Sequence, residues 1–195
     1  MVGLPTTFVR LTGCPLRCAY CDTEHAFHGG QWMTFGEIKN KVAAFGARYV
    51  TVTGGEPLAQ KQCLLLLRRL SDAGYEVSLE TSGALDVGGV DPRVVKIMDL
   101  KTPGSGEARK NLYANIEHLA PCDQVKFVVC DRDDYKWARQ HLDDYKLSAR
   151  CEVLFSPSHG RLSPGVLADW ILADRLAVRF QIQLHKYLWG DVPGR

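Results

Sequence analysis

Apolar segments rich in β-branched residues alternate with helix-forming segments along most of this chain. Several apolar runs are continuous, as expected for parallel strands that are buried on both faces of a sheet. The expected strands are Thr6–Thr12, Tyr49–Thr53, Tyr75–Thr81, Val94–Leu100, Gln124–Cys130, Cys151–Ser156 and Val178–His185. The expected helices, the first of which opens with a capping box, are Thr34–Phe45, Gln60–Ala73, Asp131–Leu142 and Ser163–Ala173.

This alternation predicts an α/β fold whose parallel strands are joined by right-handed crossovers. The chain has 195 residues, fewer than the roughly 250 that are usual for a complete eight-fold barrel. We therefore expect a single domain over residues 1–195, a partial TIM-like (β/α) barrel of about six units. Functional residues in such folds gather where the strands end, so polar groups that directly follow strands are candidates for a site.

Three cysteines crowd the loop after the first expected strand. Cys14, Cys18 and Cys21 have the spacing C-x3-C-x2-C, which can hold one compact soft-metal centre. Four-iron clusters usually take four cysteines, so three cysteines would leave one iron open to a ligand. An open metal position distinguishes reactive sites from structural ones. The loop therefore indicates a reactive [4Fe–4S] cluster.

A structural zinc site is the alternative interpretation of the same loop. Its fourth ligand would be a distant residue, His25 or Cys122. Closed zinc sites commonly combine two closely spaced cysteine pairs, and no second pair occurs here. We therefore favour the cluster. The cysteines outside the loop are expected to be buried as small core residues: Cys63, Cys122, Cys130 and Cys151.

Composition limits the expected binding partners and cellular compartment of the protein. A net charge of +2 and a pI near 8.2 give no case for binding nucleic acid or a membrane. Seven cysteines, three of them in one loop, favour a reducing compartment and metal chemistry. No apolar run reaches the roughly 18 residues of a membrane span, and no signal peptide is recognised. We expect a cytoplasmic protein.

Four further segments carry glycines or polar side chains directly after expected strands. They are Thr53–Pro57, Leu79–Gly83, Asp99–Thr102 and Ser156–His159. Consecutive glycines let a backbone approach a ligand closely, although they also suit an ordinary turn. Asp99 and Lys101 are expected on the same side of their strand, either as ligand-binding groups or as a structural ion pair.

These motifs together resemble the radical S-adenosylmethionine (SAM) superfamily and, within it, the 7-carboxy-7-deazaguanine synthases. The resemblance covers nearly the whole chain and rests on Phe8–Thr23, Thr53–Pro57, Glu80–Gly83 and Gln183–Leu188. It implies a [4Fe–4S] cluster whose open iron binds SAM and cleaves it to a 5′-deoxyadenosyl radical. The implied lyase reaction converts 6-carboxy-5,6,7,8-tetrahydropterin to 7-carboxy-7-deazaguanine and ammonia, by radical ring contraction, on the route to queuosine in tRNA. SAM would be regenerated, and Mg²⁺ would assist.

The resemblance also implies roles for residues at matching positions. Cys14, Cys18 and Cys21 would bind the cluster, and Thr23 would bind Mg²⁺, although a turn that caps the loop is the alternative for Thr23. The implied substrate contacts are Arg10, Thr53 and His185. The implied SAM contacts are Tyr20, Cys21, Asp22, Gly55, Glu56, Glu80, Ser82, Asp99, Leu100, Lys101, Ser156, Pro157, Ser158 and His159. No side chain is assigned as catalytic, because the SAM-derived radical does the chemistry.

Two features depart from the family pattern. Relatives usually carry an upstream strand that ends in a Gln-Gly-Glu substrate-binding segment. This sequence begins just past that segment, so we expect weakened pterin binding. The sequence also continues through Trp189–Arg195, so no contact between a C-terminal carboxylate and the substrate is assumed.

The expected partners are a small pterin substrate, a reducing protein such as a flavodoxin, and a second copy of the chain in a homodimer. Two rival functions share some of the motifs. An activating enzyme that places a glycyl radical on a large protein would use the same cysteine loop and glycine turn. A zinc-binding module without enzymatic activity would use only the cysteines.

Overall fold

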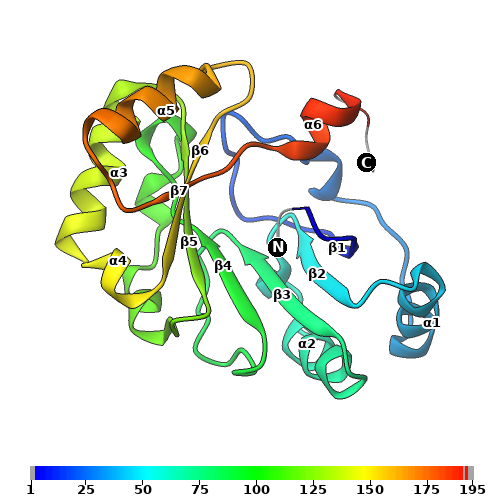
Figure 1. Cartoon of the computed structure of the whole chain (residues 1–195). Coiled ribbons are helices and arrows are strands. Elements are labelled where there is room, and N and C mark those ends of the chain that lie inside the picture. The colour runs from blue at the N-terminus through cyan, green and yellow to red at the C-terminus, as the bar shows by residue number, and fades with distance from the viewer. Residues whose placement is uncertain (1–2, 191, 193–195) are drawn as a thin grey trace.

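The computed structural model describes residues 3–190 and residue 192. The expectations about the first residues of the chain and about the end of its tail lie outside these residues. Parallel strands form one sheet in chain order, from β1 to β7 (Figure 1). They are β1 (Thr6–Leu11), β2 (Tyr49–Gly54), β3 (Glu76–Thr81), β4 (Val95–Asp99), β5 (Gln124–Val129), β6 (Glu152–Pro157) and β7 (Arg179–Phe180). Among the described residues β1 and β7 do not pair, so the sheet is an open, partial barrel, as predicted.

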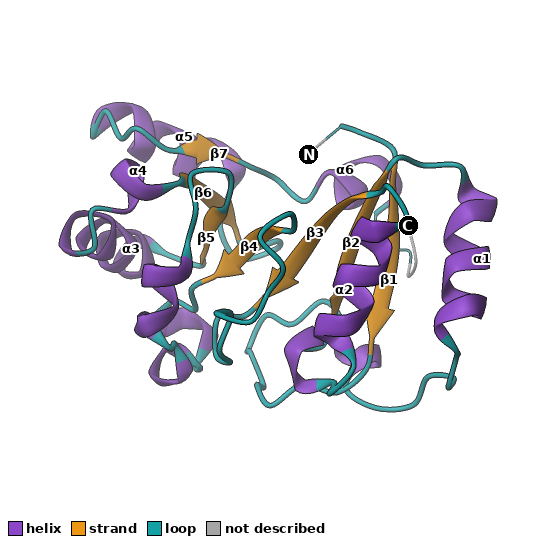
Figure 2. Ribbon diagram, turned by 90° about the horizontal axis from the view of Figure 1, so that it is seen from below, coloured by secondary structure: helices purple, strands orange, loops and turns teal. Residues whose placement is uncertain are grey.

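Helices cover the outer side of this curved sheet (Figure 2). They are α1 (Phe35–Phe45), α2 (Cys63–Asp72), α3 (Arg132–Asp144), α4 (Leu147–Arg150) and α5 (Pro164–Ala173), while α6 (Leu184–Trp189) follows the last strand. The capping box predicted for α1 is confirmed, because Thr34 Oγ1 accepts from Glu37 N at 3.2 Å and Glu37 Oε2 accepts from Thr34 N at 2.6 Å. No helix among the described residues has both the length and the apolar character needed to cross a membrane.

The hydrophobic core lies between the sheet and the outer helices. Alternate strand residues such as Val52 and Leu79 are fully buried there, against Leu67 of α2. A second cluster packs Phe127 and Phe155 against α3 and α5. Because successive side chains of a strand point to opposite faces, the remaining residues face the inside of the partial barrel, which we call the concave face.

Polar and charged residues line this concave face. Arg10 pairs in register with Thr53, and Asp99 pairs with Lys126. Residues that pair across neighbouring strands share a face, and Val9 and Leu11, on either side of Arg10, pack against the core. The face that the helices do not cover therefore carries these polar groups, together with apolar residues such as Ile97 and Val128.

Two predictions about structure were wrong. The expected strand Val178–His185 is reduced to Arg179–Phe180, and His185 lies in α6 instead of closing a strand. The edge strand has a single neighbour, and after Gln181 N bonds to Phe155 O at 3.0 Å the chain leaves the sheet. Cys122 is exposed because it lies in a turn before β5, whereas the burial predicted for the other three core cysteines is confirmed.

Candidate functional site

The cysteine loop leaves the carboxyl end of β1 and crosses the ends of the neighbouring strands (Figure 1). Cys14, Cys18 and Cys21 are each half-buried. The loop is closed at its base, because Gly13 N donates to Ala26 O at 2.8 Å. Cys21 N donates to Cys18 O at 3.1 Å, so the second and third cysteines share one tight turn. The loop therefore presents three thiols at the end of the sheet where the site was predicted.

The three thiols of the described loop do not converge on a position for one metal ion. No three Cys, His, Asp or Glu side chains of the described residues are placed to hold one metal ion. In a four-iron cluster each thiolate binds its own iron, so the three cysteines need not meet at one point. Burial raises the pKa of the Cys18 thiol, Lys101 opposes this, and Asp99 and the other two loop cysteines reinforce it. Exposed Cys122, in the turn before the amino end of β5, is not placed to complete a zinc site.

The glycine turn, Gly54 and Gly55 at the end of β2, lies in close contact with the backbone at the start of the cysteine loop. A Cβ atom on Gly54 would collide with the backbone oxygen of Leu11. A Cβ atom on Gly55 would collide with Gly13 O and lie 2.8 Å from Cys14 Cβ. Glu56 N donates to Gly13 O at 2.8 Å, which ties the two segments together. Glycine is required here because two backbones meet.

Both carboxylate oxygens of Glu56 accept hydrogen bonds from other groups of the protein. It accepts from Leu58 N at 3.1 Å, from Thr81 Oγ1 at 2.9 Å and from Ser82 N at 2.7 Å. The Ser82 hydroxyl also donates to it. Glu56 is fully buried, so it joins the ends of β2 and β3 behind the site. Glu56 and Ser82, which were both predicted to contact SAM, are thus hydrogen-bonded to each other.

Asp99 and Lys101 lie on the same side of the chain, as predicted, and form an ion pair at 3.0 Å. Burial opposes the charge on Lys101, but Asp99 and Tyr20 raise its pKa on balance. The other carboxylate oxygen, Asp99 Oδ1, and the Tyr20 hydroxyl are both buried and have no hydrogen-bond partner among the described residues. Buried polar atoms are rarely left in this state. Two such atoms beside one ion pair suit the polar groups of a bound SAM.

The concave face continues the site away from the cysteine loop. Thr53 Oγ1 donates to Glu80 Oε2 at 3.2 Å, and both residues share this face with Arg10. Within the described residues, neither Arg10 nor Lys126 forms an ion pair with a neighbour. Two cations therefore lie on the concave face without a salt bridge among the described residues, although the charge of Lys126 acts on the Asp22 carboxylate.

Lys126 is a candidate site residue that was not predicted from the sequence. It pairs in register with Asp99, and its charge helps to lower the pKa of Asp22. The signal was present in β5, where Lys126 is the charged residue on the face opposite buried Val125 and Phe127. Arg161 was also not predicted. Its Nη2 donates to Ala19 O at 2.8 Å, and no sequence pattern indicates this contact because the two residues are distant in the chain.

Asp22 connects the cysteine loop to the last part of the chain. Its carboxylate accepts from Thr23 Oγ1 at 2.8 Å and from Gln183 Nε2. Burial alone would raise the pKa of Asp22, but these hydrogen bonds and the charges of Lys186 and Lys126 lower it. The Gln183 contact brings the start of α6, and with it His185, to the same end of the sheet.

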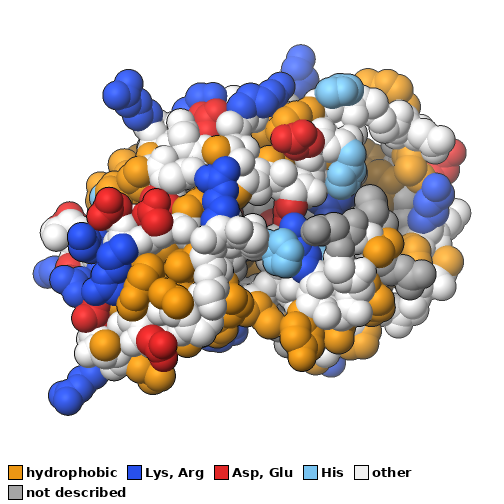
Figure 3. Space-filling model, turned by 90° about the horizontal axis from the view of Figure 1, so that it is seen from above, with side chains coloured by type: hydrophobic (Ala, Val, Ile, Leu, Met, Phe, Trp, Pro, Cys, Tyr) orange, Lys and Arg blue, Asp and Glu red, His pale blue; other side chains and the backbone are white. Residues whose placement is uncertain are grey.

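The loop after β6 borders the site from the other side. Ser156 and Ser158 are buried, and Ser158 N donates to Val129 O at 2.8 Å. His159 is exposed, and the buried side chain of Leu100 packs in the core, so Leu100 offers a ligand only its backbone. Seen from above, acidic and basic side chains are interspersed over this end of the molecule (Figure 3).

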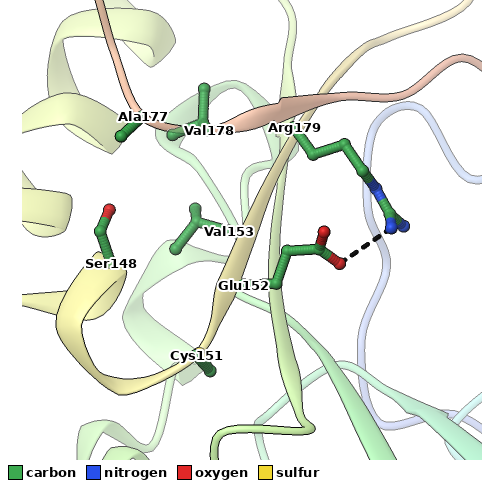
Figure 4. Close-up of a pocket in the computed structure, with 7 residues that line it drawn as sticks. All are labelled: Ser148, Cys151, Glu152, Val153, Ala177, Val178 and Arg179. Atoms are coloured by element: carbon green, nitrogen blue, oxygen red, sulfur yellow. Dashed lines mark ion pairs between the residues drawn. The ribbon is translucent and has the colours of Figure 1, made fainter.

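A separate cavity of about 470 Å³ lies at the amino ends of β6 and β7 (Figure 4). Arg179 and Glu152 form an ion pair at 2.9 Å beside it. Its lining residues are Ser148, Cys151, Glu152, Val153, Ala177, Val178 and Arg179. None of the predicted site residues lines this cavity, which opens at the opposite end of the strands from the cysteine loop.

The open parallel barrel and the three-cysteine loop define a protein of the radical SAM class. The family model described as "Radical SAM superfamily" matches residues 8–100. A 7-carboxy-7-deazaguanine synthase of Chlorobaculum tepidum is 46% identical, over 96% of this chain and 87% of that protein. A synthase of the same name from Koribacter versatilis is 42% identical, over 96% and 89%. The chain belongs to the family of 7-carboxy-7-deazaguanine synthases, and membership implies a [4Fe–4S] cluster and SAM.

Solved structures share the fold. The crystal structure of QueE from Escherichia coli matches with a TM-score of 0.73 and 22% identity, over 93% of this chain and 86% of that one. SuiB of Streptococcus suis bound to S-adenosylmethionine matches with a TM-score of 0.63 and 13% identity, over 92% and 51%. At these identities the likeness concerns the arrangement of strands and helices.

Proposed function

We propose that this protein is a radical SAM lyase that converts 6-carboxy-5,6,7,8-tetrahydropterin to 7-carboxy-7-deazaguanine and ammonia, for queuosine biosynthesis. The observation that carries the proposal is the 46% identity to a named synthase over 96% of the chain. The geometry supports it, because the cysteine loop, the glycine turn and the Asp99–Lys101 pair meet beside a polar concave face.

Cys14, Cys18 and Cys21 would hold the cluster, which together with SAM supplies the radical that acts on the substrate. The unpartnered atoms Asp99 Oδ1 and Tyr20 Oη would bind polar groups of SAM. Gly55 would contribute its backbone, and the Ser156–His159 loop would border the ligand. In this proposal Glu56 and Ser82 position the two turns and do not themselves contact SAM.

The pterin would lie over the concave face. Arg10 and Lys126 would bind its carboxylate, because a guanidinium fork and an ammonium both pair well with that group. Thr53 and Glu80 would orient the ring through their hydrogen-bonding groups. His185 would approach from α6, which the Asp22–Gln183 contact holds in place.

Oxygen ligands for Mg²⁺ are available beside the last cysteine. Thr23 and Asp22 lie within hydrogen-bond distance of each other, 2.8 Å between their side-chain oxygens. Two protein oxygens leave most of an octahedral shell to water and to the substrate carboxylate. Mg²⁺ binding would therefore depend on substrate. We also propose a single domain, a homodimer and a one-electron donor such as a flavodoxin as the working state.

The test is anaerobic turnover by reconstituted protein with SAM, Mg²⁺, a reductant and 6-carboxytetrahydropterin, followed by mass spectrometry. The expected result is the deazapurine product with most of the SAM unconsumed. Stoichiometric loss of SAM, no product and a glycyl radical on an added polypeptide would favour the activating-enzyme alternative. A colourless protein that binds zinc would contradict the radical chemistry altogether.

A further inference from the structure

The connection between β4 and β5 lies against the cysteine loop and bonds to its backbone. Glu107 Oε1 accepts from Arg17 N at 2.6 Å, and Ser105 O accepts from Ala19 N at 2.9 Å. These two amides flank Cys18 on either side. Contacts of this kind satisfy loop backbone groups that no helix or sheet satisfies.

A third contact completes the set. Lys110 Nζ donates to Pro15 O at 2.6 Å, and the same ammonium pairs with Glu107 at 3.1 Å. The connection therefore touches the loop both between Cys14 and Cys18 and between Cys18 and Cys21. We call residues Thr102–Asn111 the clasp.

The clasp is itself held at both ends. Asn111 bonds to both backbone groups of Lys101, accepting from its N and donating to its O, each at 2.9 Å. Buried Asp134 accepts from Gly104 N at 2.7 Å and from Thr102 Oγ1 at 3.0 Å. A clasp anchored in this way is able to impose a position on the cysteine loop.

Among the clasp residues, Glu107 is the charged group that accepts a hydrogen bond from the cysteine loop. Its side chain is only 12% exposed, and the hydrogen bond from the Arg17 amide, with help from Lys110, lowers its pKa. A charged acceptor makes a stronger hydrogen bond than a neutral one. Arg17 is fixed in turn, because its Nη1 donates to Cys14 O at 2.8 Å. One residue thus links the carboxylate to two cluster cysteines.

We propose that Glu107 is a positioning residue for the iron–sulfur cluster. Through Arg17 it sets the placement of Cys14 and Cys18, and through the clasp it couples that placement to the Asp99–Lys101 pair at which SAM would bind. This inference rests on the cluster and does not depend on the identity of the substrate.

The experiment compares reconstituted wild-type protein with Glu107→Ala, Glu107→Gln and the control Glu117→Ala. Glu117 pairs with Arg150 at 3.0 Å and is 71% exposed, away from the clasp. One readout is the rate of iron release to a chelator. The other is the change that SAM causes in the electron paramagnetic resonance spectrum of the reduced cluster. Neither readout needs pterin.

We expect Glu107→Ala to release iron roughly tenfold faster, because a hydrogen bond to a charged group is lost, and to show a smaller response to SAM. Glu107→Gln keeps an acceptor oxygen and should stay within about threefold of wild type. The control should behave as wild type. Glu107→Ala indistinguishable from the control, or Glu107→Gln as damaging as Glu107→Ala, would overturn the proposal. So would wild-type protein that binds no iron, which would also remove the cluster assignment.

Discussion

Gly55 shows what the absence of one side chain makes possible. The turn that contains it reaches the cysteine loop so closely that a Cβ atom would meet both Gly13 O and Cys14 Cβ. The backbone of Gly55 is thereby placed beside Cys14 of the cysteine loop. The polar residues of the candidate site depend on similar local detail. Asp99 uses one oxygen for Lys101, and its other oxygen has no hydrogen-bond partner in the part of the chain that the structure describes.

Gly55→Ala should destabilise the protein by about 2 kcal/mol, because the new methyl group meets backbone atoms that cannot rotate away. Cluster content after reconstitution should fall as well. The matched control is Gly165→Ala in α5, where the nearest atom would be Ser163 Oγ at 3.9 Å. Urea unfolding and iron analysis check both variants. Equal stability of the two variants would contradict the close approach.

Arg10→Met should raise the KM for the pterin by roughly tenfold to a hundredfold, because the substrate would lose a hydrogen bond to a charged group. The affinity for SAM should not change, because the side chain lies on the concave face beside Thr53. Arg48→Met is the control, since Arg48 pairs with Glu76 at the other end of the strands and is 72% exposed. An unchanged KM for the pterin would remove Arg10 from the substrate site.

At the scale of elements, Asp134 joins parts of the fold that are distant in sequence. It lies in the first turn of α3, is 1% exposed, and accepts from Thr102 and Gly104 in the clasp. It also accepts from Cys130 N at 3.0 Å. One buried carboxylate therefore holds the residues that follow both β4 and β5.

Asp134→Ala should lower the free energy of unfolding by about 3 kcal/mol, because several buried donors lose their acceptor. The neighbouring variant Asp133→Ala removes a side chain that is 91% exposed and should change stability by no more than about 0.5 kcal/mol. Chemical denaturation of both variants measures the difference. A loss of less than about 1 kcal/mol for Asp134→Ala would show that other contacts hold the clasp.

At the scale of the whole molecule, the core on the outer side of the sheet contains thiols as well as hydrocarbon. Cys63 is 1% exposed, and burial raises its pKa to about 12 from the ordinary value of 9.0. Burial likewise raises the pKa of Cys151 to about 11. These thiols are neutral in the folded protein, so the pH dependence of stability follows from where they ionise.

The sign of that dependence is set by the raised pKa. The stability contribution of Cys63 is complete below about pH 9 and is lost as pH rises toward about 12. The loss reaches at most about 1.4 kcal/mol per pH unit. Unfolding measured near pH 8 and near pH 10 should show a smaller alkaline loss for Cys63→Ala than for wild type. Exposed Cys122→Ala is the control, and an equal loss in both variants would contradict the assignment.

The sequence by itself determined the strands β1 to β6, the capped helix α1 and the cysteine spacing, because these depend on local periodicity and on neighbours in the chain. The last strand was predicted wrongly, because at a sheet edge the pattern of Val178–His185 competes with contacts such as Gln183 to Asp22.

Only the tertiary structure decided which side chains meet. Glu107 and Arg17 lie 90 positions apart, and Arg161 and Ala19 lie 142 positions apart. No local pattern encodes such pairs, since they form when parallel strands bring their carboxyl ends to one edge of the sheet. For the same reason, only the structure revealed that the Glu56 carboxylate accepts a hydrogen bond from Ser82 N. It also revealed that Lys126 shares the concave face with Arg10.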